Sequence, residues 1–110
     1  MKFKTDFVTN SSSTAFIITN TSDIDKTLVD FVEENPQLVE EFNEMYDYEY
    51  TQQQMLESAA QEVIIFKAGE SRYSVFGDEQ GTVIGHVFDY ILRDGGSSEN
   101  FDWRFCEYQR

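Results

Sequence analysis

The stretch from Asp23 to Tyr50 constrains the fold most strongly, because its apolar residues recur at helical spacing and its charged positions are nearly all acidic. It holds ten carboxylates against one cation, Lys26, and so carries −9 of the chain's net charge of −13. This pattern predicts amphipathic helices whose charged sides face solvent. The carboxylates are Asp23, Asp25, Asp30, Glu33, Glu34, Glu40, Glu41, Glu44, Asp47 and Glu49.

Two helices joined by a sharp corner are predicted in this stretch. Ser22 and Asp25 have the form of a capping box at the start of the first helix. Asn35-Pro36 ends it, because proline cannot continue a helix but suits the first turn of the next one. The apolar face of the first helix comprises Ile24, Leu28, Phe31 and Val32, and that of the second comprises Leu38, Val39, Phe42, Met45 and Tyr46.

The acidic residues of this stretch have two possible roles. Two helices of roughly 12 residues each span about 18 Å, so nine net charges give about one per 2 Å, close to the one per 1.7 Å of duplex DNA. Glu40 and Glu44 form a like-charge pair at i, i+4, which costs about 0.2 to 0.5 kcal/mol. The acidic surface could serve only to keep the protein soluble, or it could bind a cationic partner; the sequence leaves both open.

Length and composition indicate one domain, residues 1–110, that buries a core without metal or disulfide. Ten Phe, six Tyr and one Trp argue against wholesale disorder. Cys106 is the single cysteine, so no internal disulfide forms, and we expect it to be packed within a strand. Apolar runs are too short for a signal peptide or a membrane span, which predicts a soluble intracellular protein. An isoelectric point near 4.2 disfavours direct binding to nucleic acid or to anionic membranes.

At the N-terminus we expect a strand at Phe16 to Thr19 and a short one at Lys2 to Val8, separated by a turn or exposed loop at Asn10 to Thr14. The segment Phe7 to Phe16, FVTNSSSTAF, resembles the start F-V-x-N-S-S-S-S-S-F of many small uncharacterised proteins of bacteria and their phages. It departs from that pattern at Thr14 and Ala15. The resemblance implies a bacterial or phage origin, and hence the cytoplasm of a bacterial cell, but no activity.

Three tyrosines, Tyr46, Tyr48 and Tyr50, alternate with Asp47 and Glu49 after the second helix. They form either the frayed end of that helix or a loop. Tyrosine interleaved with carboxylate is also a good contact surface, because tyrosine brings a large area at low entropic cost.

After residue 50, changes in the spacing of apolar residues predict a helix and then two strands. Thr51 is expected to cap a helix over Gln52 to Gln61. The continuous apolar run Val63 to Phe66 predicts a buried strand, and a turn then leads into Arg72 to Phe76, so the two form a hairpin.

A strongly apolar helix over Val83 to Leu92, which contains His86, is predicted to end at the glycines that follow Asp94. The last segment alternates, with Phe101, Trp103 and Phe105 facing inward from a strand.

No catalytic, cofactor or metal motif is present in the sequence. The chain lacks a phosphate-binding glycine loop, a dinucleotide fingerprint, CxxC and HExxH. Asp23-x-Asp25 begins like a calcium loop, but Leu28 stands where that loop needs glycine. The single histidine, His86, has no motif that links it to a serine nucleophile. We therefore expect a protein that is not an enzyme and uses no cofactor.

Together these patterns predict an α+β domain with an antiparallel sheet of about three to five strands, helices on one side and an acidic helical hairpin. By composition alone it resembles the acidic DNA-mimicking inhibitors of phages, among them many anti-CRISPR proteins. This implies binding in the basic groove of a host nucleic-acid-handling protein, such as a nuclease or CRISPR effector. The expected partner-binding residues are Asp30, Glu33, Glu34, Glu40, Glu41, Glu44, Asp47, Glu49, Tyr46, Tyr48 and Tyr50.

Two alternatives stay open. In the first, the chain is a structural or assembly protein that acts through a sheet edge or as a homodimer. In the second, it is a small enzyme that uses His86 with nearby acids.

Overall fold

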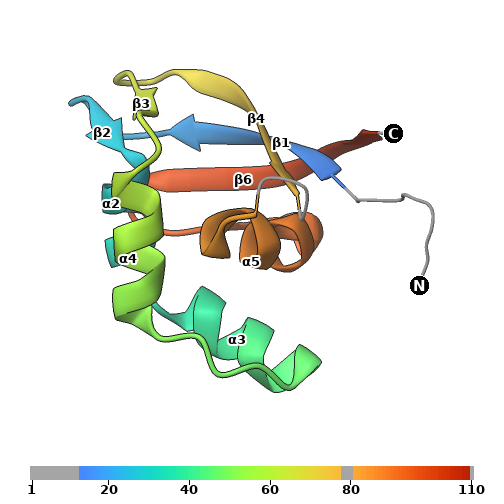
Figure 1. The fold of residues 1–110 in the computed structure, drawn as a ribbon. Helices are drawn as coiled ribbons and strands as arrows, with labels where there is room; N and C mark the ends of the chain where they lie inside the picture. Colours follow the sequence, from blue (N-terminus) through green and yellow to red (C-terminus); the bar gives the residue numbers. More distant parts are fainter. Residues whose placement is uncertain (1–12, 78–80, 110) are drawn as a thin grey trace.

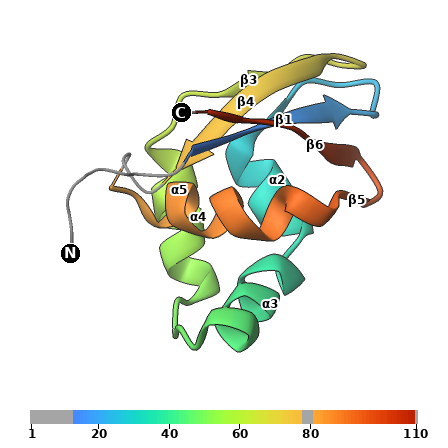
Figure 2. The same cartoon turned by 90° about the vertical axis from the view of Figure 1, so that its right-hand side faces the viewer.

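A four-stranded antiparallel sheet carries helices on one face (Figures 1 and 2), which confirms the predicted α+β class. This computed structural model describes residues 13–77 and 81–109, so the strand predicted at Lys2 to Val8 lies outside the described residues. In chain order the elements are β1 (Ser13–Asn20), β2 (Lys26–Thr27), α2 (Leu28–Glu34), α3 (Gln37–Tyr46), α4 (Gln52–Ala60), β3 (Ile65–Phe66), β4 (Ser71–Gly77), α5 (Val83–Ile91), the 3-10 helix η2 (Leu92–Asp94), β5 (Gly96–Ser97) and β6 (Phe101–Gln109). The sheet has the order β4-β1-β6-β5, and β2 pairs with β3 in a second, two-stranded sheet.

β1 is an inner strand of the main sheet and begins earlier than predicted. Phe16 and Ile18 are fully buried toward the helices, as their β-branched and aromatic character favours. Ser13 and Thr14, expected in an exposed turn, are instead buried strand residues. The Thr14 hydroxyl is satisfied there because it donates to Asp89 at 2.5 Å.

β6 carries an irregularity that changes which residues face the core. In the pairing with β1, Ala15 lies opposite Glu107 and Phe16 opposite Phe105, so Cys106 is the extra residue of a bulge. Phe101 and Trp103 are buried as predicted, but Phe105 is 36% exposed and Cys106, expected to be packed, is exposed. This end of β6 runs past the helices (Figure 1), so its side chains have less to pack against.

The N-cap of the first acidic helix is Thr27, five residues later than the predicted cap Ser22. Thr27 and Asp30 form the capping box: the Thr27 amide donates to the Asp30 carboxylate at 2.8 Å and the Asp30 amide donates to the Thr27 hydroxyl at 3.3 Å. Ser22 lies in a turn held by Asn20, whose side chain accepts from the Ser22 amide at 2.9 Å. Ile24 is consequently outside the helix and 57% exposed.

The predicted hairpin between Val63 to Phe66 and Arg72 to Phe76 is wrong. β3 contains only Ile65 and Phe66 and pairs with β2, whereas β4 pairs with β1. Val63 is 91% exposed, so the apolar run is not a buried strand. Of the residues in this run, only Phe66 is fully buried, so the hydrophobicity of the run did not predict its burial.

The helices fill the space beneath the sheet. α2 packs mainly on α4 and α3 on α5, with the corner at Pro36 between the two acidic helices. In both views α3 lies farthest from the sheet (Figures 1 and 2). Phe31 is central to the core, with edge-on contacts to Phe88, Phe101 and Trp103 at centroid distances of 5.5, 5.0 and 5.2 Å. The acidic end of α3 is thereby left at the periphery of the molecule.

α4 and α5 match their predictions closely. Thr51 caps α4 in a capping box with Gln54, and Thr82 caps α5 by accepting from the Gly85 amide. α5 ends at Ile91 and passes directly into η2, whose C-cap is Gly95; φ there is +73°, a backbone conformation that favours glycine.

Candidate functional site

The C-terminal end of α3 and the segment after it form a continuous exposed surface. All six residues from Glu44 to Glu49 are exposed, and they alternate carboxylates with Met and Tyr. We call these six residues the α3-end surface. Met45 is 62% exposed and Tyr48 is 43% exposed, although both are large apolar side chains. Exposed aromatic and Met side chains among charged neighbours are typical of protein-binding surfaces.

Asn43 makes hydrogen bonds to the backbone of the segment that follows α3. Its side chain donates to the carbonyl of Tyr50 at 2.7 Å and accepts from the amide of Tyr50 at 3.1 Å. Its own carbonyl accepts from the amide of Tyr48 at 3.1 Å. Of the three tyrosines, Tyr46 is therefore the last residue of α3, and Tyr48 and Tyr50 lie in a hydrogen-bonded loop. An ordered loop loses less entropy when a partner binds.

Beneath this surface the tyrosines meet residues from α5 in an aromatic cluster centred on Phe42, which is fully buried. Ring centroids of Tyr46, Tyr48 and His86 lie 5.1, 5.3 and 5.1 Å from that of Phe42. The members of the aromatic cluster are Phe42, Tyr46, Tyr48, Tyr50, His86 and Tyr90. The exposed rings are thus fixed to the core through a buried one.

His86 joins the loop to α5. Its Nδ1 lies 2.9 Å from the Tyr50 hydroxyl, and its ring meets Tyr48 edge-on at 4.9 Å. The sequence placed His86 in this helix but gave no sign of these contacts, because Tyr50 and His86 are 36 positions apart.

The α3-end surface carries only negative charge. Unsatisfied carbonyls make the C-terminal end of a helix negative, and the last turn of α3 holds no basic residue to offset that charge. Glu44 and Asp47 add carboxylates at the same end, and Asp47 is in the left-handed conformation with φ of 59°. Each of these features costs stability, so the surface is not arranged for stability alone.

The predicted partner-binding acids divide into exposed and internally engaged ones. Glu33 on α2 and Glu40, Glu41 and Glu44 on α3 are exposed, as are Asp47 and Glu49 in the loop. Asp30, in contrast, caps α2.

Glu34 is also engaged internally. Its carboxylate accepts from the Ser98 hydroxyl and, at 2.8 Å each, from the backbone amide and the side chain of Asn100. Burial would raise the pKa of Glu34, but these hydrogen bonds and nearby Lys26 lower the pKa below its ordinary value. Asp30 and Glu34 therefore hold the fold together, and their contacts compete with any partner.

An ion pair between Asp89 on α5 and Arg93 on η2 was not predicted. Asp89 is fully buried and accepts from Arg93 at 3.2 Å and from Thr14 at 2.5 Å. The Arg93 guanidinium also lies over the rings of Tyr90 and Tyr108, at 4.7 and 5.1 Å from their centroids. The available signal was the i, i+4 spacing of Asp89 and Arg93 at the end of an apolar segment.

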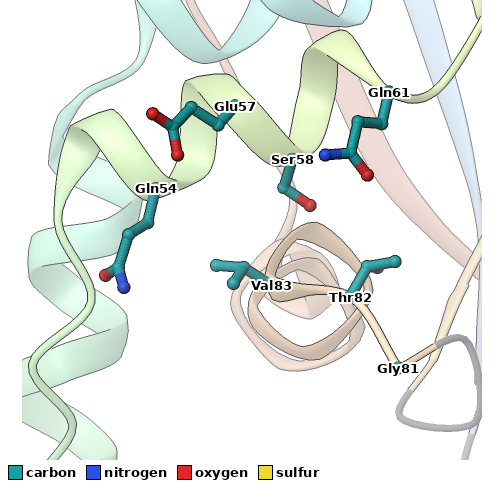
Figure 3. A pocket seen from close by; sticks show the side chains of 7 residues that line it. All are labelled: Gln54, Glu57, Ser58, Gln61, Gly81, Thr82 and Val83. Atoms are coloured by element: carbon teal, nitrogen blue, oxygen red, sulfur yellow. The ribbon is translucent and has the colours of Figure 1, made fainter.

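Two cavities flank the start of α5 and share Gly81, Thr82 and Val83. The first, of about 320 Å³, lies against α4 and is polar; Figure 3 shows Ser58 and Gln61 on its α4 side. The second, of about 430 Å³, is lined by the three shared residues together with Tyr48, Tyr50 and His86. The second cavity opens beside the α3-end surface and is called the aromatic cavity below.

Within residues 13–77 and 81–109, no group of three His, Cys, Asp or Glu side chains is placed to hold a metal ion. In the same part of the chain no helix is long and apolar enough to cross a bilayer. No protein-family model, curated protein or solved structure matches the chain.

Proposed function

We propose that this protein is a binding module that engages a basic protein partner through the α3-end surface and acts by binding rather than by catalysis. The observation that carries the proposal is the run Glu44 to Glu49, which is exposed throughout, alternates acid with aromatic or Met side chains, and is held by Asn43. Aromatic side chains supply the buried anchors of an interface, and carboxylates supply complementary charge and faster association.

The loss of stability caused by the acids at the C-terminal end of α3 supports a binding role. Acid at the C-terminal end of a helix costs about 0.3 to 1 kcal/mol per group, and the left-handed conformation costs most non-glycine residues about 1 to 2 kcal/mol and Asn or Asp less. Asn at position 47 would satisfy the same turn without the charge. A surface that only solubilised the protein would gain nothing from placing its acids here.

The finer proposal is that the partner handles nucleic acid and that this protein competes with DNA or RNA for its basic groove. The chain's net charge of −13 favours attraction to groups that otherwise bind phosphate. Glu40, Glu41 and Glu44 extend the acidic surface along the outer side of α3, opposite its buried face of Leu38, Val39 and Phe42.

Charge reversal confined to the surface tests the proposal. The triple variant Glu44→Lys, Asp47→Lys, Glu49→Lys should recover less than about a tenth of the partner that the wild type recovers from a bacterial lysate, since rim charges of this kind govern association.

The matched control reverses three exposed acids elsewhere, Asp23→Lys, Glu99→Lys and Asp102→Lys, and therefore has the same net charge. We expect the control to keep most of the recovery. Equal losses in both variants would show that only net charge matters and would contradict a defined surface. Salt-resistant recovery of the chain itself would instead favour self-association.

A further inference from the structure

We propose that the aromatic cavity receives the guanidinium group of an arginine side chain from the protein partner. This inference deepens the proposed function and rests on it, because it names the group that the partner presents beside the α3-end surface. Three of the six residues that line the cavity carry rings, Tyr48, Tyr50 and His86.

The three rings that line the cavity pack against one another. Tyr48 and Tyr50 are stacked, with centroids 5.3 Å apart and planes at 21°, and His86 meets both of them edge-on. The volume of about 430 Å³ lies within the range of about 300 to 1,000 Å³ for small-molecule pockets, so it has room for a guanidinium group. A cation over the face of such rings is attracted by their quadrupoles.

The charges around the cavity favour a cation over an anion. Asp47 and Glu49, both exposed, flank Tyr48 in the chain. The positive N-terminal end of α5 also borders the cavity, but two of its first amides are engaged: that of Ile84 donates to Ser58 at 3.1 Å and that of Gly85 to Thr82 at 2.9 Å. An anion would find those donors occupied and carboxylates nearby.

The same aromatic cluster already binds a guanidinium at its other end. Arg93 lies over Tyr90 at 4.7 Å, and among the described residues it is the only cation found over a ring. Arginine suits a ring wall better than lysine does, because its group is planar and more weakly hydrated and so stacks at lower desolvation cost. The occupant is therefore an arginine rather than a lysine.

A peptide titration tests this directly. The probes are acetyl-Gly-Arg-Gly-amide, its lysine counterpart and its citrulline counterpart, which has the shape of arginine without the charge. The readout is the NMR shift of the ring signals of Tyr48, Tyr50 and His86. We expect saturable shifts with arginine, weaker ones with lysine and none with citrulline. Equal shifts with citrulline, or no ring shifts with arginine up to about 20 mM, would overturn the inference.

Protein variants supply a matched control. Tyr48→Leu should weaken arginine binding about two- to thirty-fold, the range expected for loss of one cation–π contact, whereas Tyr48→Phe keeps the ring and should bind nearly as well as the wild type. Equal weakening by both variants would contradict a ring-based site.

This experiment separates the two proposals. If the charge-reversal variant loses its partner but the arginine peptide leaves the rings unshifted, the acidic surface stands and the arginine site falls. If the peptide binds at the rings but charge reversal leaves recovery unchanged, the arginine site stands and the proposed function falls.

Discussion

At the scale of single residues, Asp47 combines two features that cost stability. Among the described residues it is the one non-glycine residue with positive φ, and its carboxylate sits at the negative end of α3. Asp47→Asn keeps the shape, tolerates the left-handed conformation and removes the charge. We expect the free energy of unfolding in urea to rise by about 0.3 to 1 kcal/mol. Asp23→Asn, in an exposed bend, serves as control, and a lower stability for Asp47→Asn would contradict this account.

The contacts of Glu34 predict that the stability of the fold decreases as the pH falls. Its folded pKa is lowered from the ordinary value of 4.5, so its charged form stabilises the fold. That contribution is complete above the unfolded pKa and is lost as pH falls through the folded pKa. Glu34→Gln should therefore be less stable than the wild type near pH 7, and the difference should shrink below about pH 4.5. A difference that is constant from pH 7 to pH 3 would exclude a role for the charge.

Asp89 is the residue whose loss should cost most. Asp89→Ala leaves Arg93 without its ion pair and Thr14 without its acceptor in the interior. Because Arg93 is partly exposed, we expect a loss of about 2 to 4 kcal/mol in urea unfolding, near the lower end for buried pairs. Asp94→Ala, exposed on η2, should change stability by less than about 0.5 kcal/mol. Similar values for the two variants would mean that the buried pair is energetically neutral.

At the scale of elements, the loop after α3 depends on one side chain. Asn43→Ala removes two hydrogen bonds to the backbone of Tyr50 and should cost about 1 to 3 kcal/mol. It should also speed hydrogen exchange at the Tyr50 amide by more than tenfold, while the amides of β1 change only with global stability. Unchanged exchange at Tyr50 would show that the loop is held by its rings alone.

The elements that could be predicted were those with local signals. Thr51 before α4 and Gly95 after η2 marked their helix ends because caps depend on neighbouring residues. The pairing of β3 could not be predicted, because its partner β2 lies some 40 positions away and an apolar run resembles a buried strand whatever it pairs with. The true start of α2 was missed for a related reason, since Asn20 and the β2 pairing hold residues 22–27 outside the helix.

Some residues of the candidate site could be predicted from local sequence and others could not. The sequence identified the tyrosines and acids of residues 46–50, because they are consecutive. It did not identify His86 or Tyr90 as their neighbours, because those contacts exist only once α5 packs on α3. It also treated Glu34 as a surface acid, since nothing local shows that Ser98 and Asn100 will enclose it.

At the scale of the whole molecule, 21 acidic against 8 basic residues produce self-repulsion. Salt should screen this repulsion, so the free energy of unfolding should rise between about 0.01 and 0.15 M NaCl, as the Debye length falls from about 30 to about 8 Å. The control triple variant, which replaces three negative charges with three positive ones, should show a smaller rise. A stability that falls with salt in the wild type would mean that favourable ion pairs outweigh the repulsion.

We propose that the α3-end surface competes with nucleic acid for a basic partner. The most direct measurement is recovery of that partner from a bacterial lysate at low and high salt, with and without added duplex DNA, for the wild type and both triple variants. We predict that recovery falls with salt and with DNA, and that the α3-end variant recovers little under any condition. Recovery that resists both salt and DNA, or that survives reversal of Glu44, Asp47 and Glu49, would contradict the claim.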